Sequence, residues 1–191
     1  MTTPRRPVHL LIDRVCIAEH DTHEILAPTW WSVDIYEGLE TYRRTCAAFS
    51  REQQIFNAVR WYEAEVCNGG HDQFYSNSTG IVWEDALAGL DLASLEVPAR
   101  LLRESAVRMG GSPSFDREER NLVLDRFEPD FEDLDSAFYE DLRQNGSLDD
   151  RLLPYIRAHP DRFLFQGVIL MPSDGDGGLA SRISRASPDP G

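Results

Sequence analysis

The hydrophobic positions between residues 55 and 67 follow a helical period and mark the segment around which the chain is organised. One helix face is formed by positions spaced four, three and four residues apart: Ile55, Val59, Tyr62 and Val66. Asn68-Gly69-Gly70 predicts the end of this helix, because glycine readily adopts the left-handed conformation that closes a helix. The pattern therefore predicts a central and most buried helix over Ile55–Cys67.

The same periodicity predicts further helices on both sides of this segment. Ser50 is a suitable N-cap for the central helix, and Gln53 supplies the glutamine version of a capping box. The other predicted helices cover residues 33–49, 78–93, 98–109, 116–126, a segment starting at 129, and 149–159. The predicted fold class is all-α, a single-domain bundle of about six or seven helices.

The two ends of the chain lack a clear helical period. Val8, Leu10 and Ile12 alternate as a strand would, but the neighbouring apolar residues blur the pattern. We therefore predict a short irregular N-terminal arm over residues 1–29, with one hairpin as the alternative. Residues 168–191 are rich in Pro, Gly, Ser and Asp and predict a flexible C-terminal tail, which leaves 30–167 as the helical domain.

Composition narrows the classes of partner. The 191 residues carry a formal net charge of −14, which disfavours direct binding to nucleic acid or to an anionic membrane and favours a basic protein. Three widely spaced cysteines and the lack of a long apolar run predict a cytoplasmic protein. The polar run 19–24 and the Asp-Gly run 174–178 lack the recurring ligand spacing of zinc and calcium sites, so we expect no metal and no cofactor.

Much of the negative charge is concentrated in residues 116–150, which hold thirteen acidic residues and four arginines, a local net charge of −9. Apolar positions at helical spacing predict one buried stripe: Phe127, Phe131, Leu134, Phe138 and Leu142. Carboxylates on the opposite side would form an exposed ridge, with these residues as candidate partner contacts: Asp130, Glu132, Asp133 and Glu140. Duplex DNA presents one phosphate charge per about 1.7 Å of its axis, and neighbouring surface positions on a helix lie about 5–6 Å apart, so a comparable spacing of charges is attainable. The alternative is that the ridge only keeps the protein soluble.

A polar stretch, His71–Gly80, follows the central helix. In one interpretation it forms a binding or catalytic pocket together with preceding residues: Glu65, Asn68, His71, Asp72, Gln73 and Asn77. In the other, Asn68, Gln73 and Asn77 hydrogen-bond the backbone of a tight turn while Phe74 and Tyr75 fill the core. No nucleophile, phosphate loop or metal spacing accompanies His71 and Asp72, so no catalytic residue is assigned.

The chain resembles a bacterial domain family that is named after a DNA-mimic protein. The resemblance is carried mainly by a central motif: Glu65, Asn68, Gly69, Gly70, His71, Asp72, Gln73, Phe74, Tyr75, Asn77 and Gly80. It continues in three later groups, Glu119-Arg120-Asn121, Leu134-Asp135 and Phe138-Tyr139, and spans roughly residues 30–165. Cys67 departs from the family pattern, which has a polar residue there. The resemblance implies an all-helical domain, and the motif itself implies no particular activity.

Together these observations lead to one main functional hypothesis. The chain is expected to be a non-enzymatic, acidic interaction domain that binds a basic protein, such as a DNA-binding regulator, and competes with DNA. An immunity-type protein that neutralises a basic toxin would use the same electrostatics and is the first alternative. An enzyme with a polar pocket around His71 and Asp72 is the second.

Overall fold

The computed structural model of the chain describes residues 5–172. Most of this part is helical, with ten α-helices, two short 3₁₀-helices and one two-stranded sheet. The elements in chain order are β1 (Arg5–Ile12), α1 (Arg14–Glu19), α2 (Thr22–Ile25), α3 (Ala27–Ser32), α4 (Gly38–Cys46), α5 (Arg51–Ser76), η1 (Ser78–Val82), α6 (Trp83–Leu92), α7 (Glu96–Arg108), α8 (Arg117–Phe127), α9 (Glu132–Asn145), α10 (Leu148–Ala158), η2 (Pro160–Arg162) and β2 (Phe165–Pro172). The fold is thus mostly helical and not purely all-α.

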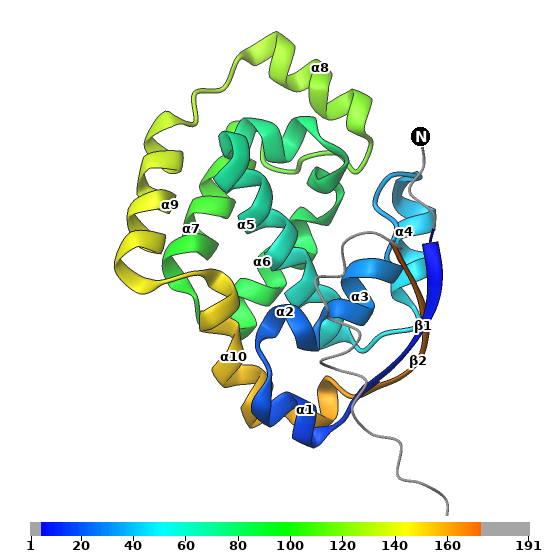
Figure 1. The fold of residues 1–191 in the computed structure, drawn as a ribbon. Helices are drawn as coiled ribbons and strands as arrows, with labels where there is room; N and C mark the ends of the chain where they lie inside the picture. Colours follow the sequence, from blue (N-terminus) through cyan, green and yellow to red (C-terminus); the bar gives the residue numbers. More distant parts are fainter. Residues whose placement is uncertain (1–4, 173–191) are drawn as a thin grey trace, which may run out of the picture.

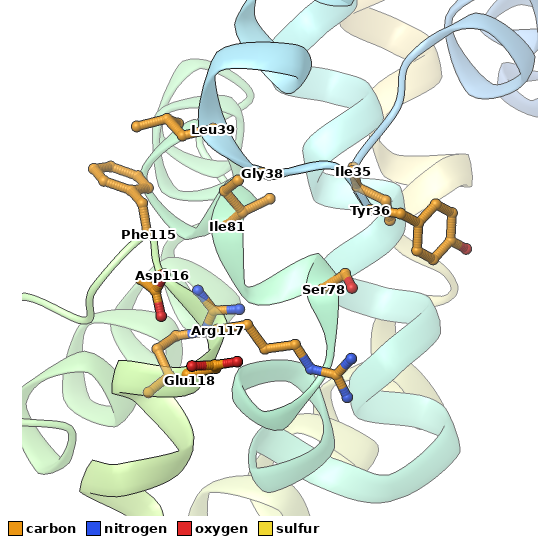
Figure 2. A pocket seen from close by; sticks show the side chains of 11 residues that line it. Ile35, Tyr36, Gly38, Leu39, Ser78, Ile81, Phe115, Asp116, Arg117 and Glu118 are labelled. Carbon is orange, nitrogen blue, oxygen red and sulfur yellow. The ribbon is translucent and has the colours of Figure 1, made fainter.

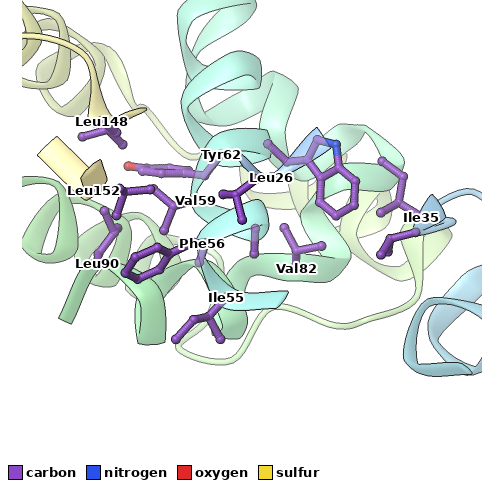
Figure 3. Packing of buried hydrophobic residues seen from close by; sticks show 14 of the residues in the cluster. Leu26, Ile35, Ile55, Phe56, Val59, Tyr62, Val82, Leu90, Leu148 and Leu152 are labelled. Carbon is purple, nitrogen blue, oxygen red and sulfur yellow. The ribbon is translucent and has the colours of Figure 1, made fainter. Parts of the chain in front are cut away.

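Helix α5 lies at the centre of the fold, as the sequence predicts. Three groups of elements surround it: α6 with α7, α9 with α10, and the N-terminal helices and strands. Helix α8 lies across one end (Figure 1). Side chains from α5 meet those of α6 and α10 in the hydrophobic core, where Phe56, Val59 and Tyr62 lie beside Leu90 and Leu152 (Figure 3). The predicted capping box is confirmed, because the Ser50 hydroxyl accepts from the backbone of Gln53 while the Gln53 side chain accepts from the backbone of Ser50.

The prediction of an irregular N-terminal arm is wrong. Strand β1 pairs with β2 in antiparallel register, from Arg5 opposite Pro172 to Ile12 opposite Phe165. The alternating side chains of Val8, Leu10 and Ile12 are all buried, and three short helices follow the strand. The partner strand also corrects the predicted tail, since residues 168–172 belong to β2; residues 173–191 lie outside the described part of the chain.

The glycine pair produces a bend in place of a helix end. Gly69 and Gly70 have non-helical backbone angles, with φ of −162° and +74°, and the helix resumes at once on the far side. The stretch after Gly70 is therefore not a polar loop: residues 71–76 continue α5 and residues 78–82 form η1.

The apolar stripe of the acidic segment is interrupted. Glu128 adopts a left-handed conformation with φ of 42°, which ends α8 and separates Phe127 from the rest of the stripe. Phe127 is 63% exposed, whereas Phe131, Leu134 and Phe138 are buried. Within the acidic segment, the buried stripe is therefore confined to Phe131 and α9, which carries carboxylates on its other side.

Candidate functional site

The bend in α5 connects the central helix to the acidic helix α9. Asp135 of α9 accepts a hydrogen bond from the backbone N–H of His71 at 2.9 Å, and the same oxygen lies 2.5 Å from Nδ1 of His71. Because a carboxylate only accepts, the imidazole proton sits on Nδ1. The hydroxyl of Tyr62 lies 2.9 Å from Nε2, and burial raises the pKa of Tyr62 well above its ordinary value, so this hydroxyl stays protonated.

Glycine is required at the bend for two reasons. Gly70 combines φ of +74° with ψ of −174°, a conformation that side chains with a Cβ rarely adopt. A Cβ at Gly70 would also lie 2.2 Å from Oδ2 of Asp135. The bend, the histidine and the carboxylate of α9 therefore form one structural unit.

The structure does not bring His71 and Asp72 together as an acid–base pair. His71 is fully buried with both ring nitrogens partnered, whereas Asp72 is exposed on the adjacent turn. Within residues 5–172, no group of three or more His, Cys, Asp or Glu side chains is arranged to hold a metal ion.

The other motif residues organise the segment after the bend. Glu65 accepts hydrogen bonds from Gln73 at 2.7 Å, Asn77 at 2.9 Å and Thr79 at 3.0 Å. The sequence analysis predicted that the side chains of Asn68, Gln73 and Asn77 bond the backbone of a turn. Instead, Gln73 and Asn77 bond the Glu65 carboxylate, and Asn68 is exposed. The prediction that Phe74 and Tyr75 fill the core is confirmed, since both are fully buried.

Arg120 is a buried residue to which the sequence analysis assigned no role. From α8 it donates to the carbonyl oxygens of Tyr75, Asn77 and Ser114, each at 2.8 Å, and so satisfies the end of α5. Burial lowers its pKa to about 10, which still leaves the guanidinium charged at neutral pH. Arg120 also leaves no room for a side chain at Gly80, because a Cβ there would lie 2.6 Å from Nε of Arg120. The only sequence signal for this contact was the place of Arg120 in the family resemblance.

The four candidate partner contacts are all exposed. Glu132, Asp133 and Glu140 lie on α9, and Asp130 precedes the helix, where its carboxylate accepts from the backbone N–H of Glu132 at 2.9 Å. Asp130 and Glu132 have no arginine within ion-pairing distance among the described residues. Both carboxylates are therefore exposed without an ion pair, although that of Asp130 also accepts from the backbone at the start of α9.

The other two carboxylates are paired within the chain. Arg108 of α7 holds Asp133 through two hydrogen bonds of 2.5 and 2.7 Å, and these bonds lower the pKa of Asp133 to about 2. Arg143 holds Glu140 through bonds of 2.8 and 2.6 Å and, together with Gln144, lowers the pKa of Glu140. The sequence did not predict these pairs, which reduce the net charge of the ridge while fixing two of its carboxylates in place.

Further acidic side chains of α9 face the protein. Asp135 binds His71, and Asp141 is buried in an ion pair with Arg151 of α10 at 2.5 Å. The hydroxyl of Tyr139 adds a bond of 2.7 Å to the carbonyl of Val66 in α5. These contacts hold α9 at both ends, so the exposed carboxylates occupy a fixed surface.

These features define a mostly helical, acidic domain whose bent central helix anchors a helix with an exposed carboxylate row. The chain belongs to the DMP19-like protein family, because the sequence profile of that family matches residues 47–159, more than half of the chain. The family takes its name from DNA mimic protein 19, which confirms the resemblance inferred from the motif. Searches of curated proteins and of solved structures give no match. None of the helices within residues 5–172 is long and apolar enough to cross a membrane.

Proposed function

We propose that this protein is a non-enzymatic interaction domain of the DNA-mimic type, which binds a basic, DNA-binding protein through the ridge formed by Asp130, Glu132, Asp133 and Glu140. The observation that carries the proposal is the rigid attachment of α9. Its inner carboxylates are bonded to α5 and α10, while its outer carboxylates remain exposed on a helix that cannot easily rotate. Membership of the DMP19-like family supports the same function.

Rigidity matters because DNA mimicry depends on the position of charges as well as on their number. A partner that binds duplex DNA presents arginine and lysine side chains at positions set by phosphates about 1.7 Å apart along the axis. Carboxylates that are already held in place meet such a surface with a smaller loss of side-chain entropy. At Asp133 and Glu140 the intramolecular arginines already restrict the carboxylates, and a carboxylate retains acceptor sites for a second donor.

A pull-down with the full chain at low and high salt identifies candidate partners, and purified components then give association rates. Neutralising the ridge with Asp130→Asn, Glu132→Gln, Asp133→Asn and Glu140→Gln should slow association by about tenfold or more and flatten its salt dependence, because exposed charges act mainly on the rate of encounter. A DNA duplex containing the partner's site should compete with the wild-type chain.

The matched control changes four exposed acids elsewhere: Glu19→Gln, Glu37→Gln, Glu40→Gln and Glu96→Gln. Both variants change the net charge by the same amount. If association is slowed equally in both, the total charge of the protein explains the effect and a specific role for the ridge is refuted. If DNA fails to compete while a partner enzyme is inhibited, the immunity-type alternative is favoured.

A further inference from the structure

A pocket of about 540 Å³ lies on the face between the segment before α4 and the start of α8, away from the carboxylates of α9. Its walls combine apolar side chains with two arginines, namely Ile35, Leu39, Ile81, Phe115, Arg117 and Arg120. Figure 2 shows Leu39, Ile81 and Phe115 above the first turn of α8, with the side chain of Arg117 extending below Ser78. Such a volume suits a small organic ligand, since ligand pockets typically measure about 300–1,000 Å³.

Two arginines line this one pocket of an acidic chain. Neither Arg117 nor Arg120 forms an ion pair with a carboxylate within residues 5–172, although acidic residues outnumber arginines by 33 to 19 in the sequence. Arg120 is only 1% exposed. The charge of the exposed Asp116 offsets only part of the desolvation that lowers the pKa of Arg120, so the surroundings of this buried guanidinium need explanation.

Carbonyl groups at the end of α5 compensate part of the positive charge of these two arginines. The Nε atom of Arg117 donates to the carbonyl of Ser76 at 2.7 Å, and Arg120 donates to carbonyls at the same end of α5. The end of a helix carries only about half a negative charge, whereas the two arginines carry two positive charges. Asp116 and Glu118 also line the pocket, but both are exposed, and Asp116 caps α8 by accepting from the backbone of Glu119.

Each guanidinium has more N–H groups than its contacts use. The three carbonyl bonds of Arg120 use three of its five N–H donors, and the single bond of Arg117 uses one. A carboxylate can accept two parallel N–H bonds from such a fork, while an aryl or branched alkyl group would cover Leu39, Ile81 and Phe115.

We propose that this pocket binds a small organic carboxylate with an aromatic or branched apolar body, held at its anionic end by Arg117 and Arg120. The net charge of −14 repels anions from the molecule as a whole, so anion binding would report this local site and not general attraction. This site is separate from the proposed partner surface, and neutralising the ridge would leave it intact.

The test uses the fluorescent probe 1-anilinonaphthalene-8-sulfonate, an anion with an aromatic body, and displaces it with 3-phenylpropionate. Saturable one-to-one binding is expected, with the acid displacing the probe at least tenfold more effectively than 3-phenylpropionamide, which differs only in lacking the charge. Arg117→Gln should weaken binding of the acid by about tenfold and leave the amide unchanged, whereas Arg117→Lys should restore part of the loss.

Arg126→Gln is the matched control, because Arg126 lies on the same helix but outside the pocket, over the ring of Phe127. Circular dichroism melting of each variant shows that the chain remains folded. Equal displacement by the acid and the amide, equal loss in the Arg117→Gln and Arg126→Gln variants, or no saturable binding of either the probe or 3-phenylpropionate would each overturn the proposal.

Discussion

Replacing Gly70 by alanine tests whether the bend in α5 and the attachment of α9 are one structural unit. The backbone of Gly70 is strained for any residue with a Cβ, and that Cβ would lie 2.2 Å from Oδ2 of Asp135. Alanine at this position must therefore displace the carboxylate that accepts both hydrogen bonds from His71.

The expected cost follows from these two effects. A non-glycine residue in such a conformation costs about 1–3 kcal/mol. Loss of the carboxylate leaves buried donors of His71 unsatisfied, which costs about 1–3 kcal/mol more. Gly70→Ala should therefore lower the free energy of unfolding by about 2–6 kcal/mol. Gly110→Ala is the matched control, since Gly110 has φ of +96° but nothing within 4 Å of the added Cβ, and it should cost only about 1–2 kcal/mol.

Urea unfolding followed by circular dichroism at 222 nm gives both free energies, and a double-mutant cycle isolates the contact. In an Asp135→Ala background the clash is absent, so Gly70→Ala should cost about as little as the Gly110 control. If Gly70→Ala is equally costly in both backgrounds, backbone strain alone explains the effect and the bend does not depend on α9.

Two further predictions concern the histidines. Nδ1 of His23 lies 2.7 Å from Nη2 of Arg60 and must accept; burial and then the charge of Arg60 lower the pKa of His23. The unfolded chain therefore binds the His23 proton more tightly than the folded chain does. The contribution of His23 to stability should be fully present above pH 6.5 and be lost as the pH decreases below it. The urea midpoints measured at pH 7.5 and at pH 5.5 should therefore differ less in the His23→Gln variant than in the wild type. His71→Ala should lower the melting temperature but leave the association rate with a basic partner nearly unchanged, and a specific turnover lost in a still-folded His71→Ala variant would contradict the non-enzymatic proposal.

The sequence predicted those parts of the fold that depend on local patterns. The central helix and its Ser50 cap follow from residues within a few turns of one another, whereas the two glycines, predicted to end the helix, only bend it. The sheet was missed because β1 and β2 lie at opposite ends of the described chain, and neither strand shows in its own sequence which segment completes it. A short alternation such as Val8, Leu10 and Ile12 becomes a strand only through that distant pairing.

The candidate site was predicted as a set of residues but not as a set of contacts. Glu65, Gln73 and Asn77 are polar and close in sequence, yet their spacing does not show that the carboxylate accepts from both amides. The partner of His71 was assigned least well, because the adjacent Asp72 suggested a pair and the true partner, Asp135, comes from another helix. Buried polar residues are matched across the fold, so sequence neighbours are a weak guide to them.

The arginines change what the acidic ridge offers to a partner. If all four ridge carboxylates were free, the ridge would attract any basic surface with little regard to geometry. Because Arg108 and Arg143 hold Asp133 and Glu140, the two ridge carboxylates without an ion pair among the described residues are Asp130 and Glu132, at one end of α9. The paired carboxylates then offer their remaining acceptor sites at fixed positions along the helix. Under the proposed function, such a surface would attract a basic partner first at the α8–α9 connection and then select it by the placement of its donors, which a solubility surface would not do.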